Sequence, residues 1–160
     1  MNTNRMYTTQ WTLLLVLALI LSQTACGESQ SATAPYFGGM ILKIESDRSS
    51  LKNGESVHTK FRATNTGSQP IAIESQDTPV LDIIVEEVPS RRKLASWANQ
   101  YPDKVSHYME WKPGESKVIE LTWTYSGHES LFADVGGFLY ENSRVAQIAG
   151  VRLCLEPCRP

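Results

Sequence analysis

The segment "VHTKFRATNTG", residues 57–67, alternates between two sets of side chains. In an extended chain one set faces one side and the other set the opposite side: Val57, Thr59, Phe61 and Ala63 against His58, Lys60, Arg62 and Thr64. A period of two residues is typical of a strand that buries one face in a core. Asn65-Thr66-Gly67 has the residue types of a turn that ends such a strand. This segment therefore predicts a half-buried antiparallel strand.

Further extended segments lie on both sides of it. In chain order they are "MILKIESD" (40–47), "QPIAIES" (69–75), "VLDIIVEEV" (80–88), "VSHYMEW" (105–111) and "KVIELTWTY" (117–125). Two or three more strands fit into residues 130–156, and the last of them is "GVRLCLE" (150–156). Turn residues such as Asn53-Gly54 and Pro113-Gly114 separate them. The sequence therefore predicts an all-β fold, an immunoglobulin-like antiparallel β-sandwich of about seven or eight strands.

Two segments interrupt this pattern. Residues 89–104, "PSRRKLASWANQYPDK", are expected to form an irregular loop with one helical turn around residues 94–98. Gly136-Gly137 lacks the strand–loop–helix context of a phosphate loop. We expect a bulge or bend at these two glycines.

The amino-terminal segment has the pattern of an export signal. Arg5 is the single charged side chain before an apolar run from Trp11 to Leu21, and Thr24-Ala25-Cys26 follows. A membrane-spanning helix needs about 20 apolar residues, whereas a shorter run behind a basic start and before small residues is typical of a secretory signal peptide. The order resembles a bacterial lipoprotein signal, in which the cysteine becomes the lipidated first residue of the mature protein.

This resemblance implies a division of the chain into three parts. Residues 1–25 are expected to be a lipoprotein signal peptide, residues 26–36 a flexible tether with lipidated Cys26, and residues 37–160 the β-sandwich domain. The protein would be anchored in the cell membrane by lipid on its extracytoplasmic side, because two or more acyl chains hold stably where one binds marginally. The alternative is an ordinary secretory signal cut nearby, which leaves Cys26 as a free thiol.

The remaining composition excludes several kinds of ligand. The formal net charge of −2 and the distribution of the charges along the chain predict no nucleic-acid binding. The three histidines are scattered singly, so we expect neither a metal nor another cofactor. Cys154 and Cys158 form an even pair for an oxidising compartment, and the sequence predicts a disulfide between them.

Three segments resemble the BsuPI family, the intracellular proteinase inhibitor domain. They are "FRATNTGSQPIAIESQDTPVLDIIVEE", "LASWANQYP" and "MEWKPGESKVIELTW", and the matching residues are Asn65, Ser75, Gln76, Asp82, Trp97, Pro113, Gly114, Glu115, Ser116 and Trp123. The resemblance covers about residues 57–135. It implies a β-sandwich that binds proteins, with proteinase inhibition as the family's activity. One departure is the length of the segment between Gln76 and Asp82, which is longer here than in the family.

The loop at residues 89–104 carries the candidate partner-binding residues. They are Arg91, Arg92 and Lys93, followed by Trp97 and Tyr101. Arginine and large aromatic side chains dominate binding hot spots, and loops on a rigid sandwich often carry function. Two other interpretations remain open: the basic residues form a solvated loop tip, and Trp97 folds back to cap the core.

Two classes of function follow. The first is a binding module displayed outside the membrane, acting on a protease as an inhibitor or on another envelope protein. The second is a structural or accessory cell-envelope lipoprotein without inhibitory activity. We expect no enzyme, because the sequence has no G-x-S-x-G elbow and no nucleophile with a recognisable base.

Overall fold

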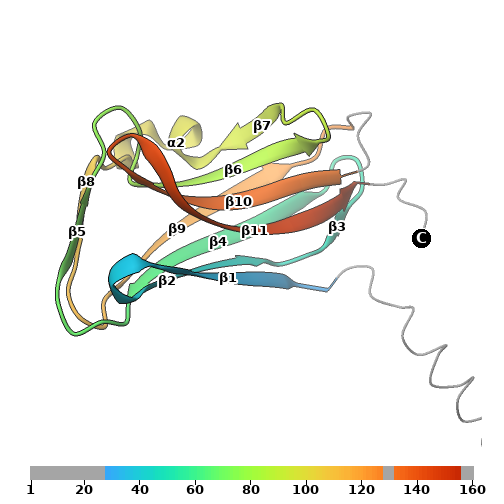
Figure 1. Ribbon diagram of the computed structural model, residues 1–160. Coiled ribbons are helices and arrows are strands. Elements are labelled where there is room, and N and C mark those ends of the chain that lie inside the picture. Colours follow the sequence, from blue (N-terminus) through green and yellow to red (C-terminus); the bar gives the residue numbers. More distant parts are fainter. Residues whose placement is uncertain (1–27, 128–131, 156–160) are drawn as a thin grey trace, which may run out of the picture.

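The computed structural model describes residues 28–127 and 132–155, and in them two β-sheets pack face to face (Figure 1). The four-stranded sheet has the order β1-β2-β4-β9, with β1 (Gln30–Tyr36), β2 (Met40–Ser46), β4 (Ser56–Asn65) and β9 (Ser116–Thr124). The five-stranded sheet has the order β3-β11-β10-β6-β7, with β3 (Ser50–Leu51), β11 (Arg144–Leu155), β10 (Phe132–Glu141), β6 (Leu81–Val88) and β7 (Lys93–Ser96). All neighbouring strands are antiparallel except β3 and β11.

Smaller elements complete the sandwich. β5 (Ile71–Glu74) and β8 (Tyr108–Trp111) form a two-stranded sheet that stands at one end of the two layers (Figure 1). Three short helices join the strands: η1 (Phe37–Gly39), α2 (Trp97–Gln100) and η2 (Pro102–Lys104). The predicted all-β sandwich is confirmed. The described residues contain eleven strands instead of seven or eight, because the sequence pattern did not predict β1, β3 and β7.

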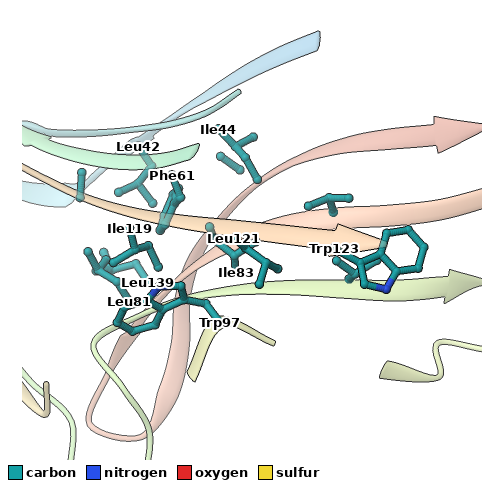
Figure 2. Packing of buried hydrophobic residues seen from close by; sticks show 14 of the residues in the cluster. Leu42, Ile44, Phe61, Leu81, Ile83, Trp97, Ile119, Leu121, Trp123 and Leu139 are labelled. Carbon is teal, nitrogen blue, oxygen red and sulfur yellow. The ribbon is translucent and has the colours of Figure 1, made fainter. Parts of the chain in front are cut away.

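The core lies between the two sheets, as alternation in the strands requires. Phe61 of β4 and Leu121 of β9 meet Ile83 of β6 and Leu139 of β10 across the gap (Figure 2). All of these side chains are at least 98% buried. Fully burying a large apolar side chain stabilises the fold by about 1.5–3 kcal/mol, so the packing of these residues is a main source of the domain's stability.

Strand β1 corrects the prediction of a flexible tether through residue 36. Residues Gln30–Tyr36 pair with β2 in continuous register, from Gln30 opposite Ser46 to Tyr36 opposite Met40. Ala32 and Ala34 pack against the core, and the Tyr36 hydroxyl donates a hydrogen bond to Glu141 Oε2 at 2.8 Å. The same segment also contacts β11 of the other sheet.

The prediction of a bulge at Gly136-Gly137 is also wrong. Both glycines are regularly paired inside β10, and the irregularity in that ladder lies between Leu139 and Tyr140. A Cβ at position 137 would lie 2.5 Å from Cγ of Phe61 and 2.6 Å from Cε2. Glycine is therefore required at position 137 because the Phe61 ring crosses directly over the backbone.

The loop at residues 89–104 is more ordered than its composition suggests. Lys93–Ser96 forms β7 against β6, and the helical turn begins at Trp97, later than predicted. Ser96 caps this helix: its Oγ accepts a hydrogen bond from Asn99 N and donates one to Asp82 Oδ2 at 2.9 Å. The Ser96 hydroxyl thus pairs both with the backbone at the start of α2 and with the buried Asp82 carboxylate. These two hydrogen bonds fix the position at which α2 begins.

Some predicted features fall outside the described residues. These are residues 1–25, Cys26 and Cys158. In the described part of the chain, no helix is long and apolar enough to cross a membrane.

Candidate functional site

The two outer faces of the sandwich differ in chemistry. The four-stranded sheet presents charged side chains in pairs, such as Lys60 Nζ at 2.9 Å from Glu120 Oε1 and Lys43 Nζ at 2.7 Å from Glu45 Oε1. The outer face of β6, β10 and β11 is mostly apolar and includes Ile148, which is 45% exposed. A solvated polar face needs no explanation, whereas an exposed apolar face rimmed by charges marks a candidate interaction surface.

A groove crosses this apolar face, and we call it the outer groove. Its floor is a row of three residues, one from each strand: Ile84 of β6, Gly136 of β10 and Gly150 of β11. Because two of the three have no side chain, the row is hollow. The depression above it has a volume of about 690 Å³.

In the next row along the strands, the residues of β10 and β11 form an apolar wall, and the β6 residue is the buried Asp82. Phe138 and Ile148 stand opposite each other in the ladder between β10 and β11. The Phe138 ring leans over Gly136, where a Cβ would lie 2.6 Å from Phe138 Cε2. A Cβ at Gly150 would meet only Val135 O at 3.5 Å and Gly136 Cα at 3.9 Å. The groove is therefore most open above Gly150.

The row on the other side of the floor is charged. Arg152 of β11 donates two hydrogen bonds to Asp134 of β10, from Nε to Oδ1 at 2.7 Å and from Nη2 to Oδ2 at 3.1 Å. Arg91, from the turn after β6, places Nη1 at 3.2 Å from Glu86 Oε2 and 3.5 Å from Asp134 Oδ2. These four groups form the charged wall of the groove.

The carboxylates of this wall lie beneath the guanidinium groups. The side chains of Glu86 and Asp134 are 25% and 24% exposed, whereas those of Arg91 and Arg152 are 68% and 59% exposed. The hydrogen bonds from Arg152 hold the pKa of the Asp134 carboxyl below its usual range, and the same contact raises the pKa of Arg152. The wall therefore presents positive charge to solvent although its formal charges cancel.

The lowered pKa of Asp134 predicts acid sensitivity. Its contribution to stability is fully present above the ordinary carboxyl pKa of about 3.9 and is lost as the pH falls through the lower folded pKa. We expect Asp134→Asn to reduce stability at pH 7 and to flatten the loss of stability between pH 5 and pH 2. Urea unfolding midpoints across this pH range measure both effects. Equal slopes for the two proteins would contradict the assignment.

The structure separates the sequence-predicted binding residues. Arg91 joins the charged wall of the outer groove. Arg92 instead binds the buried Glu87 through two hydrogen bonds, of 3.1 and 3.0 Å, and Lys93 begins the edge strand β7. The basic cluster is therefore only partly a solvated loop tip.

Trp97 and Tyr101 lie away from the groove. Trp97 is 5% exposed and belongs to the core (Figure 2), which confirms the interpretation of Trp97 as a core cap. The half-buried Tyr101 ring lies 6.1 Å from Trp97 between centroids, and Lys104 Nζ lies 4.6 Å from the Tyr101 centroid. The five predicted residues do not form one surface.

The turn around Arg91 does not have the form of a protease-reactive loop. Arg91 has φ of 60°, and its N–H donates to Glu87 O at 2.9 Å. The Glu87 N–H in turn donates to Arg92 O at 2.9 Å. These bonds close a tight hairpin between β6 and β7, where an inhibitory loop would have to be extended.

Most groove residues were missed from the sequence. Gly136, Phe138 and Asp134 occupy alternate positions in "FADVGGFLYE". That alternation could have assigned them to one face, opposite the buried Ala133 and Val135. The alternation was hard to recognise because Gly136 has no side chain, so its position does not show whether it belongs to the apolar or the polar set.

Cys154 is disulfide-bonded. The chain has two other cysteines, Cys26 and Cys158, and both lie outside the described residues. The predicted partner Cys158 stays a prediction. Within residues 28–127 and 132–155, no group of three or more His, Cys, Asp or Glu side chains is arranged to hold a metal ion.

Comparison with solved structures finds the fold in proteins of low sequence identity. Spo0M, a sporulation control protein from Bacillus subtilis, aligns with a TM-score of 0.50 and 13% identity over 75% of this chain and 50% of Spo0M. The CARDB domain of a Pyrococcus furiosus protein, solved in complex with di-metal ions, aligns with a TM-score of 0.44 and 12% identity over 84% of this chain and 95% of that domain. The chain thus spans half the length of Spo0M. No protein-family model and no curated protein sequence matches it. These likenesses bear on the fold alone.

Proposed function

We propose that this protein is an exported, lipid-anchored binding module without catalytic activity, which recognises a protein partner through the outer groove. One observation carries the proposal: the outer face of β6, β10 and β11 has a hollow apolar groove edged by charge, whereas the opposite outer face has paired charges beside single exposed apolar residues such as Ile41. The export and anchoring steps rest on the signal-like segment before Cys26.

Proteinase inhibition is the weaker form of this proposal. The residues that carry the BsuPI resemblance have structural roles where we can follow them. The buried Asn65 side chain donates to Gln69 O and Trp111 O, Asp82 holds the start of α2, and Gly114 adopts φ of 76° in a turn. Such residues support a shared fold more than a shared inhibitory surface. We therefore favour a binding or accessory lipoprotein over a protease inhibitor.

The anchor is tested by metabolic labelling with a fatty-acid analogue. We expect the label on the intact protein and its complete loss in Cys26→Ser, together with release of the protein from the membrane fraction. The matched control is Cys158→Ser, which leaves the proposed lipidation site unchanged. Label that persists in Cys26→Ser would refute the lipid anchor without bearing on the groove.

The binding surface is tested by a pair of matched substitutions. Ile148→Asp places a charge on the apolar wall of the groove, and Ile41→Asp places one on the opposite outer face, where Ile41 is 39% exposed. We expect cross-linking in membranes to capture a partner with the wild type and with Ile41→Asp, and to lose it with Ile148→Asp. Both residues lie in paired strands and are partly exposed, so urea unfolding of the two variants checks that they lose similar stability. Identical capture by all three proteins would exclude the groove as the binding surface.

A further inference from the structure

The shape and the charge of the outer groove together define the chemistry of its ligand. This inference rests on the proposed function, because it assumes that the groove is a binding surface. The floor is one row of the sheet wide, with a residue from each of three strands. Side chains on one face of a strand repeat about every 7 Å, so the empty floor row leaves a gap of one side-chain position between the apolar wall and the charged wall.

The position above Gly150 suits that side chain. It is bounded by Ile148 on the same strand and by the Phe138 ring on the neighbouring strand. An apolar group placed there would cover part of the Ile148 side chain, which is 45% exposed to solvent. Burial of apolar surface from both partners is the main favourable term in association.

The charged wall adds a requirement for a carboxylate. Of the donors on Arg91, Nη1 is engaged, while Nε and Nη2 make no hydrogen bond to the described residues. Arg152 uses Nε and Nη2 on Asp134, and its Nη1 makes none to the described residues. Guanidinium groups bind carboxylates with strong, charge-assisted hydrogen bonds. The exposed rim is therefore complementary to an acidic side chain.

The distance between these two subsites fixes their spacing in the ligand. Gly150 and Arg152 are two residues apart on the same face of β11. Two residues of a strand span about 7 Å. In an extended ligand that lies along β11, side chains two positions apart share a face and have the same separation.

We propose that the outer groove binds an extended segment of a partner protein that carries a large apolar side chain and a carboxylate two residues apart. The apolar side chain lies above Gly150, and the carboxylate pairs with Arg91 and Arg152. An apolar side chain next to the carboxylate would point to the opposite face and could not satisfy both subsites.

The test uses the full chain in lipid nanodiscs and fluorescein-labelled hexapeptides built on Leu-Ser-Glu, Leu-Ser-Gln and Leu-Glu-Ser. We expect anisotropy titration to show binding of the Leu-Ser-Glu peptide. The other two peptides should bind about tenfold more weakly, because the binding free energy of one hydrogen bond to a charged group corresponds to about a tenfold change in Kd. Empty nanodiscs report any binding to lipid. Equal affinity for all three peptides, or equal binding to empty nanodiscs, would overturn the inference.

Protein variants provide the second arm. Gly150→Val fills the floor from a position whose Cβ would make only ordinary contacts, and Arg152→Gln removes a donor from the rim. Both substitutions should lower the affinity for the Leu-Ser-Glu peptide about tenfold. Arg62→Gln on the opposite outer face should leave this affinity unchanged. If no peptide binds but Ile148→Asp still abolishes partner capture, the proposed ligand chemistry is wrong and the groove remains the binding surface. If the groove instead mediates self-association, Gly150→Val would dissociate a dimer seen by sedimentation, and the inference would again be wrong.

Discussion

Replacing Trp97 with alanine is expected to lower the free energy of unfolding by about 3–5 kcal/mol, the usual cost of truncating a buried large aromatic residue. Trp97 is 5% exposed and packs in the core at the start of α2. Removal of the indole would leave a cavity that the backbone cannot easily close. Asp82 fixes this segment because Oδ1 accepts from Ala98 N at 3.0 Å and Oδ2 accepts from Ser96 Oγ at 2.9 Å.

Urea unfolding followed by circular dichroism measures this loss. Trp97→Phe serves as the control, because it keeps an aromatic ring in the core and should cost clearly less than the alanine variant. The peptides of the groove assay should bind the folded fraction of Trp97→Ala with unchanged affinity, since Trp97 does not line the groove. Wild-type stability combined with lost partner capture would show that Trp97 is a contact residue instead.

The second large effect is expected for Gly137→Ala. A single added methyl group would overlap the Phe61 ring, which is completely buried. Either Phe61 must leave its position or β10 must move away from β4, and overpacking of this kind costs about 1–3 kcal/mol or more. The ring has little room to move, because Leu121 and Ile83 belong to the same packed cluster (Figure 2).

Gly150→Ala provides a matched control in the paired strand. It makes the same chemical change, but the new Cβ would be in ordinary contact with its neighbours. We expect its stability to equal or exceed that of the wild type by up to about 1 kcal/mol, because alanine restricts the unfolded chain more than glycine does. Similar unfolding midpoints for the two variants would contradict the close approach of Phe61 to Gly137.

The strands that could be predicted from the sequence are those with large apolar residues on one face. In β4 and β9 the alternation of apolar and polar residues predicts the buried face correctly, because large apolar side chains such as Phe61 and Leu121 are stable only in the core. In β1 the inward positions hold Ala32 and Ala34. Alanine is compatible with both a strand and a linker, so its burial depends on β11, a neighbour more than a hundred residues away.

The outer groove could not be predicted because it depends on register. Gly136 and Gly150 become neighbours only through the pairing of β10 with β11. The turn at Asn142-Ser143, where both residues have positive φ, and the irregularity after Leu139 set that pairing. A one-residue slip would move both glycines away from each other. Sequence alternation assigns a face to each residue but does not specify which residues of two strands lie side by side.

The early start of β1 has a mechanical consequence. With a lipid on Cys26, only Gly27, Glu28 and Ser29 would separate the membrane attachment from the first paired residue, Gln30. Tension from the bilayer would then enter the domain along the axis of an edge strand. It would be shared by the seven residue pairs between β1 and β2 at once, as a shearing load, instead of opening them one after another. The β1–β2 pairing next to the proposed anchor would therefore resist mechanical unfolding of the domain.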